Sequence, residues 1–164
     1  MDLDLKGKRA LVTGGSRGIG RACAQVLAEE GCMVTIASRD ALALKAAAAD
    51  IKAKTGAEVQ WRAADLSQRG AAEALAAGAG DLDILVNNAG AIPGGDLQTV
   101  DEDSWRRAWD LKVFGYINLT RAVYARMQAK RSGVIVNVLG NAGEKLNAAY
   151  IAGSTANAGL MAFT

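Results

Sequence analysis

Short apolar runs alternate along this chain with longer segments whose apolar residues recur every three or four positions. The short runs are typical of strands buried on both faces, and the periodic segments are typical of helices that pack on such strands. Their alternation predicts an α/β fold with a doubly wound parallel sheet in three αβα layers. The predicted strands span 8–13, 32–37, 57–63, 82–87 and 134–139, and the predicted helices span 18–30, 40–54, 67–77 and 101–130, with a last helix that contains 150–164.

The predicted organisation is a single domain over 1–164, because no repeat, low-complexity tract or linker interrupts the pattern. The last strand would lie at an edge of the sheet, yet its run over 134–136 is too apolar for an open row of backbone groups. We expect a partner subunit, or residues absent from this chain, to cover it. The chain stops at Thr164 within a helical pattern that has no C-capping signal, so we expect the domain to be truncated at its C-terminal end.

The composition excludes several classes of function. A net charge of +2 with scattered basic residues gives no reason to expect a nucleic-acid partner. No apolar run reaches the length of a membrane span and no signal segment opens the chain, so a cytoplasmic location is expected. Histidine is absent, which argues against Ser-His-Asp hydrolysis, Cys-His proteolysis and the usual zinc sites, and we expect no metal. Cys23 and Cys32 are predicted to be small core residues.

The segment that joins the first predicted strand to the first predicted helix is rich in glycine. It reads TGGSRGIG over 13–20. Glycine lets a backbone approach a phosphate without a Cβ atom in the way, and a helix start presents unpaired N–H groups and a positive dipole end. The segment therefore predicts that a dinucleotide binds here.

Together with later motifs, this segment resembles the short-chain dehydrogenase/reductase family. The pattern Thr13-Gly14-x-x-x-Gly18-x-Gly20 is followed by Asn-Asn-Ala-Gly over 87–90, a combination far more specific than a glycine motif alone. The resemblance covers essentially the whole chain, without the family's later strands and substrate loop. It implies a Rossmann-type, dinucleotide-binding domain. Further matches in the expected order are Asp65-Leu66, Asn137 and Tyr150.

The resemblance implies that three turns hold the cofactor. The first shapes the pyrophosphate site, the second contacts the adenine, and the third lines the adenosine ribose. Asp65 has the alternative of capping a helix, and Asn87 and Asn88 have the alternative of holding the sheet end as turn formers. The implied cofactor residues are Gly14, Ser16, Arg17, Gly18, Ile19 and Gly20 in the first turn, Asp65 and Leu66 in the second, and Asn88, Ala89 and Gly90 in the third.

The end of the second predicted strand indicates which dinucleotide is bound. An acidic residue about 20 positions beyond the glycines would bind the ribose 2′-hydroxyl of NAD, whereas Ser38 occupies this position and Arg39 follows it. Together with Arg17, Arg39 can form charge-assisted bonds to a 2′-phosphate, so NADP(H) is preferred over NAD(H). Arg39 could also be a solvated arginine. Asp40 is predicted to cap the next helix, although a shift of one residue would make it an NAD marker.

The predicted catalytic residues depart from the family pattern. The resemblance implies that Tyr150 exchanges a proton with the substrate oxygen, but Ser154 stands four residues later, where the family has lysine. The family's serine after the fifth strand is replaced by Gly140. Asn141 beside it could supply an amide donor, and the gap to Tyr150 is shorter than usual. Tyr150 could alternatively be a buried tyrosine with a satisfied hydroxyl.

Lys112 stands where the family has an asparagine on the long helix, and it interrupts an otherwise apolar stripe. A buried lysine is costly unless it meets a partner or a solvent-filled pocket. We hypothesise that Lys112 reaches toward Tyr150 and supplies the missing charge. The alternatives are a lysine that extends along the helix edge to solvent, and Lys145 in the same role.

Two functions from different classes follow from these residues. The first is an NADP-dependent short-chain dehydrogenase/reductase, an oxidoreductase that acts on a small-molecule carbonyl or alcohol and has Tyr150, Lys112 and Asn141 as catalytic residues. The second is a catalytically impaired NADP-binding protein, a sensor or scaffold. The resemblance also implies a homodimer or homotetramer. A nonfunctional truncated chain is a third possibility.

Overall fold

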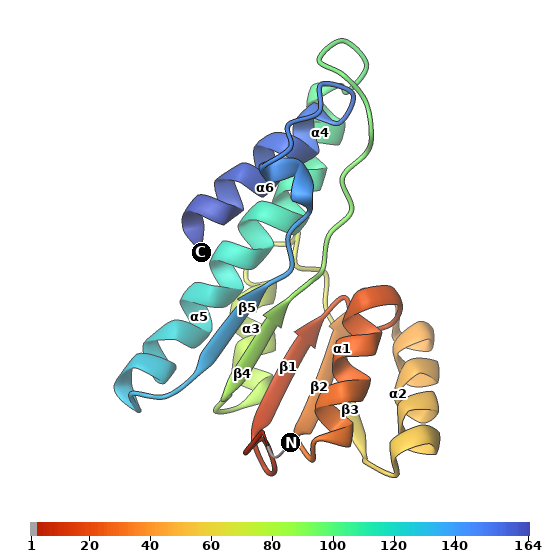
Figure 1. The fold of residues 1–164 in the computed structure, drawn as a ribbon, viewed down its shortest axis with the longest axis vertical. Coiled ribbons are helices and arrows are strands. Elements are labelled where there is room, and N and C mark those ends of the chain that lie inside the picture. The colour runs from red at the N-terminus through yellow and green to blue at the C-terminus, as the bar shows by residue number, and fades with distance from the viewer. Residues whose placement is uncertain (1–2) are drawn as a thin grey trace.

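The computed structural model of the chain describes residues 3–164. One sheet of five strands has the order β3-β2-β1-β4-β5 with every pair parallel, and helices cover both of its faces (Figure 1). This confirms the predicted doubly wound α/β fold. The strands are β1 (Arg9–Thr13), β2 (Met33–Ser38), β3 (Val59–Ala63), β4 (Ile84–Asn87) and β5 (Val134–Asn137). The α-helices are α1 (Gly18–Glu29), α2 (Ala41–Thr55), α3 (Ala71–Ala79), α4 (Glu102–Trp109), α5 (Gly115–Ala129) and α6 (Ile151–Phe163).

A hydrophobic core lies on each face of the sheet. On one face, Leu44 of α2 packs in the same buried cluster as Ile36 of β2, and α1 contributes alanines. On the other face, Leu75 of α3 and Leu119 of α5 share a cluster with Leu85 of β4. The central strands β1, β2 and β4 are therefore mainly buried, as their apolar runs predict, whereas the outer strands β3 and β5 are largely exposed.

The predicted helix over 101–130 is wrong in one respect, because it is not one regular helix. A π-helical segment, η1 (Asp110–Phe114), separates α4 from α5. A hydrophobic period near 3.6 residues cannot reveal an i→i+5 turn, and such turns occur frequently at functional sites. The third helix also begins later than predicted, at Ala71, because Gly70 before it adopts a left-handed conformation with φ of 80°.

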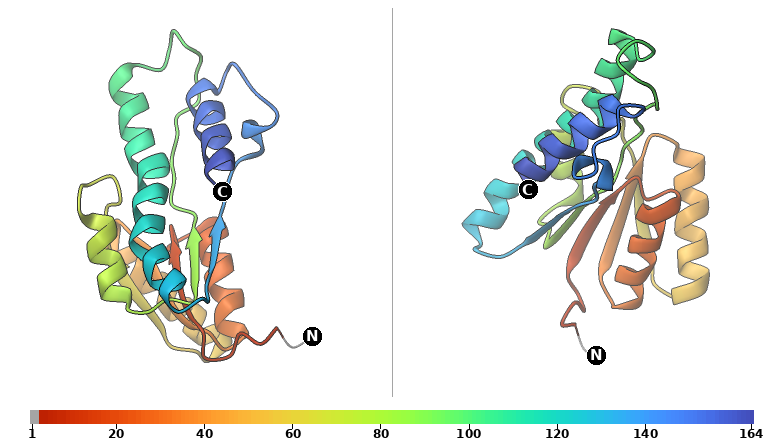
Figure 2. Two further views of the ribbon diagram at one scale, coloured as in Figure 1. Left: turned by 90° about the vertical axis from the view of Figure 1, so that its left-hand side faces the viewer. Right: turned by 45° about the horizontal axis from the view of Figure 1, so that its top comes forward.

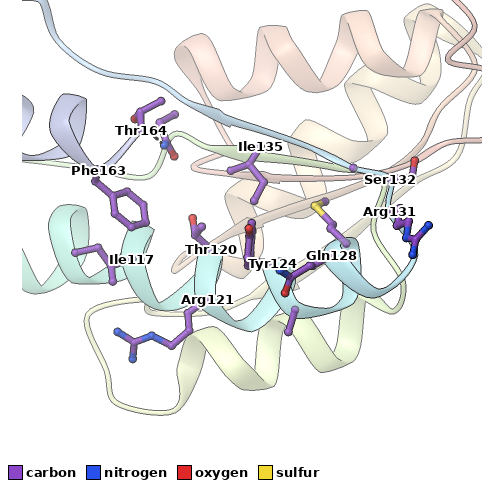
Figure 3. A pocket seen from close by; sticks show the side chains of 14 residues that line it. Ile117, Thr120, Arg121, Tyr124, Gln128, Arg131, Ser132, Ile135, Phe163 and Thr164 are labelled. Atoms are coloured by element: carbon purple, nitrogen blue, oxygen red, sulfur yellow. Dashed lines mark hydrogen bonds between the residues drawn. The ribbon is translucent and has the colours of Figure 1, made fainter.

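The edge strand β5 is not buried on both faces, although its apolar run over 134–136 predicts such burial. Val134 and Val136 are 56% and 44% exposed. A groove of about 970 Å³ runs between β5 and α5, and its lining includes Ile135, Tyr124 and Phe163 near the end of α6 (Figure 3). That a partner subunit or further residues cover this edge remains a prediction.

The helices α4 and α6 extend beyond the carboxyl ends of the strands (Figure 2). A chain of side-chain amides fixes α6 to the sheet: Asn87 Nδ2 at the end of β4 donates to Asn137 Oδ1 at 2.9 Å, and Asn137 Nδ2 donates to Thr164 Oγ1 at 3.0 Å. Asn87 Nδ2 also donates to Thr120 Oγ1 of α5 at 3.0 Å. Within residues 3–164, no helix is long and apolar enough to cross a membrane.

Candidate active site

The turn between β1 and α1 requires glycine at two positions. Gly14 and Gly18 have φ of 66° and 56°, in the left-handed region that L side chains rarely adopt. A Cβ atom added at Gly14 would lie 2.6 Å from Asn88 Nδ2 and 3.1 Å from the Cα atom of Ala89, whereas one added at Gly18 would have nothing within 4 Å. Gly14 therefore allows two turns to approach each other, and Gly18 faces open space.

The turn after β4 is bonded directly to β1. Thr13 Oγ1 accepts hydrogen bonds from the backbone N–H groups of Asn88 at 2.9 Å and Ala89 at 3.0 Å. The Asn88 amide donates back to Thr13 O at 3.0 Å. The predicted turn-forming role of Asn88 is thus present in the structure, and the same contacts hold Ala89 and Gly90 beside the glycine turn.

A hollow of about 640 Å³ opens where these turns meet at the carboxyl edge of the sheet. In an open α/β sheet this edge is where ligands bind. The structure brings most of the predicted cofactor residues to this hollow but not Gly20 or Asp65. Predicted residues in its lining are Gly14, Ser16, Arg17, Gly18, Ile19, Ser38, Arg39, Leu66, Asn88, Ala89 and Gly90.

Gly20 and Asp65 have structural contacts instead. A Cβ atom at Gly20 would collide with the Asn88 amide and with Gly14 O, so Gly20 permits the approach of α1 to the two turns. The Asp65 carboxylate accepts hydrogen bonds from Ser67 N at 3.1 Å and Ser67 Oγ at 2.7 Å. These bonds close a local turn after β3, a role close to the capping alternative, and leave an adenine contact as a prediction.

The end of β2 has polar groups that are free to meet a ligand. Ser38 Oγ is buried without a hydrogen-bond partner among the described residues, and Ser38 lines the hollow. Arg17 and Arg39 also line the hollow and are exposed. Asp40 caps α2 as predicted, because its carboxylate accepts from Ala43 N at 3.0 Å. An unpartnered hydroxyl and two guanidinium groups in one hollow fit the ribose and phosphate of a dinucleotide.

Lys112 of η1 lies beside Gly90, which lines the hollow. Its methylene groups pack against Gly90, where a Cβ atom would lie 2.9 Å from Lys112 Cδ. The Lys112 ammonium lies 5.7 Å from the centre of the Tyr116 ring. Burial lowers the pKa of Lys112, and no charged partner among the described residues offsets this burial. The structure thus brings Lys112 to Tyr116, and no recorded contact joins it to Tyr150.

Tyr150 lies at the start of α6, and its ring folds back over the first turn of that helix. A Cβ atom added at Gly153 would overlap the Tyr150 ring at Cε1 and Cζ. Ser154, in the position of the family's lysine, is buried, and its hydroxyl accepts from Asn147 N at 3.1 Å and donates to Asn147 O at 3.3 Å. Ser154 therefore holds the preceding loop and has no recorded contact with the phenol.

The third predicted catalytic residue, Asn141, begins the short 3₁₀ segment η2 (Asn141–Gly143) and is exposed. The amide that reaches the end of β5 comes from Asn157 instead, which the sequence reasoning missed. Asn157 Oδ1 accepts from Gly140 N at 2.8 Å, and Asn157 Nδ2 donates to Gly153 O at 2.8 Å. Asn157 is only 1% exposed, so it fixes α6 against the segment after β5.

One signal in the sequence could have found Gly153 and Asn157. They are four residues apart, which is the family's tyrosine-to-lysine spacing, and they come one helical turn later than Tyr150 and Ser154. This register also lengthens the short gap after β5. Among the described residues, no cluster of three or more histidine, cysteine, aspartate or glutamate side chains could hold a metal ion.

The strand order, the glycine turn and the hollow at the carboxyl edge define a Rossmann-type α/β protein. The family model described as short chain dehydrogenase matches residues 8–164. The chain therefore belongs to the short chain dehydrogenase family.

Individual relatives agree with this assignment. The chain is 35% identical to a 3-oxoacyl-[acyl-carrier-protein] reductase FabG of Chlamydia muridarum (strain MoPn / Nigg) over 98% of its own length and 66% of that protein. An L-sorbose reductase from Gluconobacter frateurii, solved with NADPH and L-sorbose, has a TM-score of 0.93 and 30% identity over 99% of this chain and 64% of that one. An NAD⁺-bound xylitol dehydrogenase has a TM-score of 0.89 and 30% identity over 98% and 63%. The chain spans 56% to 66% of the length of the first three curated relatives.

Proposed function

We propose that this protein is an NADP(H)-dependent oxidoreductase that transfers a hydride between the cofactor and a small carbonyl or alcohol substrate. The observation that carries the proposal is the hollow at the carboxyl edge of the sheet, which is lined by most of the predicted cofactor residues. Leu111 of η1 lines the hollow, and η1 packs against α6, at whose start Tyr150 lies. Membership of the short chain dehydrogenase family supports this proposed oxidoreductase function, as do relatives that are named reductases.

The residues of the hollow would hold the cofactor in three places. The glycine turn and the N-terminus of α1 would hold the pyrophosphate. Ser38, Arg39 and Arg17 would hold the 2′-phosphate, which favours NADP(H) over NAD(H). A solved relative binds NADPH and another binds NAD⁺, so the preference rests on these three side chains.

When bound, the dinucleotide supplies or accepts the hydride at its nicotinamide ring. This chain would supply the proton. A neutral phenol at Tyr150 can donate its proton to the oxygen of a carbonyl that is being reduced, and water would restore the proton afterwards. Abstraction of a proton from an alcohol requires a phenolate, and within residues 3–164 no cationic side chain forms an ion pair or a cation–π contact with the Tyr150 ring. We therefore propose that reduction is the favoured direction near neutral pH.

The neutral surroundings of the α6 start favour a second candidate function. Gly140, Gly153 and Asn157 lie together there and bring no charged group to the phenol. A protein with a complete dinucleotide hollow and no acid–base pair would bind NADP(H) as a sensor or scaffold. The two functions share their cofactor contacts and differ in turnover.

Oxidation of NADPH in the presence of a panel of small ketones and aldehydes separates the two functions. We expect turnover by the protein and a loss of about 100-fold or more in Tyr150→Phe, the size typical of a lost general acid. The control Tyr124→Phe alters an exposed tyrosine on α5 and should retain full turnover. Tight NADPH binding without turnover of any carbonyl would contradict the enzyme and favour the sensor or scaffold.

The cofactor preference has its own test. Replacing Arg39 by alanine should raise the Kd for NADPH about tenfold, the value of one charge-assisted hydrogen bond near 1.4 kcal/mol, and leave the Kd for NADH unchanged. Arg121→Ala, an exposed arginine on α5, is the matched control. A preference for NADPH that survives Arg39→Ala would remove Arg39 from this role.

The remaining proposals concern the cellular location, the substrate and the oligomeric state of the protein. We propose that it is cytoplasmic, that it acts on a small molecule and that it assembles as a homodimer or homotetramer. The exposed apolar edge at β5 supports assembly. Sedimentation equilibrium tests the oligomeric state, and a monomer at micromolar concentration would contradict it.

A further inference from the structure

The start of α6 combines a tyrosine whose ring is turned back along the helix with a glycine that has no side chain beneath it. The overlap of an added Cβ atom at Gly153 with Tyr150 Cε1 and Cζ means that the phenol ring fills the volume of a residue-153 side chain. Gly153 is buried although it lies in the first turn of the helix. The ring of Tyr150 can lie over this turn only because residue 153 is glycine.

The backbone on both sides of Tyr150 is fixed, which limits how else the ring can lie. Gly95 N donates to Ala149 O at 2.8 Å, and Ile151 N donates to Gly95 O at 3.2 Å. The carbonyl of Tyr150 accepts from Ser154 N at 2.8 Å. Since the main chain is held on both sides, a side chain at 153 would displace the ring rather than the backbone.

The helix face beneath the ring is turned toward the end of the sheet. Residues 150, 153 and 157 lie on one face of α6 by their spacing of three and four. Asn157 on this face bonds both Gly140 N after β5 and Gly153 O. The ring of Tyr150 thus lies over Gly153, on the face of α6 that contacts the segment after β5 at Gly140.

We propose that Gly153 is a positioning residue that lets the phenol of Tyr150 reach the substrate side of α6 from one helical turn earlier. This inference rests on the proposed proton-donor role of Tyr150. Asn157 supports the arrangement because it anchors the glycine carbonyl. The phenol ring of Tyr150 thus lies over Gly153, in the space that a side chain at residue 153 would otherwise fill.

The test is Gly153→Ala, with Gly159→Ala as the matched control. Both glycines lie in α6, but an added Cβ at Gly159 would have nothing within 4 Å. Alanine is the better helix former at both positions, so the two variants differ mainly in their effect on the ring. We expect Gly153→Ala to lower kcat for carbonyl reduction at least tenfold with an unchanged Kd for NADPH, and Gly159→Ala to keep kcat.

A double-mutant cycle shows whether the loss acts through the tyrosine. In a Tyr150→Phe background, Gly153→Ala should cause no further loss of kcat, because the hydroxyl that it displaces is already absent. Equal losses in both backgrounds would overturn the proposal and leave the role of Tyr150 itself intact.

A spectroscopic measurement tests the inference even if no carbonyl is turned over. The protein has three tyrosines, so 3-fluorotyrosine labelling gives three ¹⁹F resonances that Tyr→Phe variants assign. The Tyr150 resonance should shift in Gly153→Ala and stay in place in Gly159→Ala. A Tyr150 resonance unchanged by Gly153→Ala would overturn the proposal, whatever the activity of the protein.

Discussion

Two alanine substitutions in the β1–α1 turn should separate the glycine that shapes the fold from the glycine that faces the ligand. Gly14 and Gly18 have nearly the same backbone conformation, with φ of 66° and 56°. An L residue in this left-handed region costs about 1–2 kcal/mol. The backbone contribution to the loss of stability should therefore be similar in Gly14→Ala and Gly18→Ala.

The surroundings of the two new methyl groups differ. At Gly14 the added Cβ would lie 2.6 Å from Asn88 Nδ2 and close to the Ala89 backbone, and at Gly18 it would meet nothing within 4 Å. Forcing a methyl group into a packed region costs a further 1–3 kcal/mol or so. We expect Gly14→Ala to lose about 2–5 kcal/mol of unfolding free energy and Gly18→Ala about 1–2 kcal/mol.

Among the folded molecules of each variant, NADPH binding should be weakened more by Gly18→Ala than by Gly14→Ala. The Cβ at Gly18 would project into the hollow, so Gly18→Ala should weaken NADPH binding at least tenfold while it remains folded. Urea unfolding measures the first quantity, and the fluorescence enhancement of NADPH measures the second. Equal losses of stability in the two variants would refute the reasoning, because the methyl contact at Gly14 would then have no cost.

Two further predictions concern titratable groups. Lys112→Met should raise the unfolding free energy at pH 7 by about 1 kcal/mol, because burial lowers the pKa of Lys112 and so disfavours its charged form in the fold. This gain should shrink as pH rises toward 10.4, where the unfolded lysine also loses its proton, and the exposed Lys145→Met should show neither effect. If Lys112→Met also kept full turnover and an unchanged pH–rate profile, Lys112 would have no catalytic role. Asp83→Asn should cost about 1 kcal/mol at pH 7, because hydrogen bonds from the backbone of Arg9 and from Lys130 hold the pKa of Asp83 below its ordinary value. That stability is present above the unfolded pKa near 4 and is lost as pH falls through the folded pKa, so urea unfolding of wild type and variant should converge in acid, and a constant difference would contradict the assignment.

Most of the fold could be predicted because strands and helices differ in their hydrophobic period. Apolar runs located four of the strands, an alternating segment located β3, and the positions of Gly14 and Gly18 located the turn that forms the hollow. The sequence could not reveal η1, since a single wider turn changes no residue type. Nor could it place Lys112, whose long side chain reaches Tyr116 through the geometry of that turn.

The positions of the catalytic residues were harder to predict than those of the cofactor-binding residues. Cofactor residues lie in short turns directly after strands, so their positions follow from strand ends. The start of α6 follows a loop over 138–150, and the loop length decides which helical residue faces the sheet. The family resemblance points to Tyr150, whereas the residue of α6 that contacts Gly140 is Asn157.

The open edge of strand β5 has a practical consequence for purification of this polypeptide. The backbone N–H and C=O groups on its outer edge are free to pair with an extended segment of another molecule. The exposed side chains of Val134 and Val136 favour such pairing. Light scattering should therefore rise with protein concentration and with time of storage. The substitution Val136→Lys, which places a charge on this edge, should delay that rise without any change in the dinucleotide hollow, because Val136 does not line it.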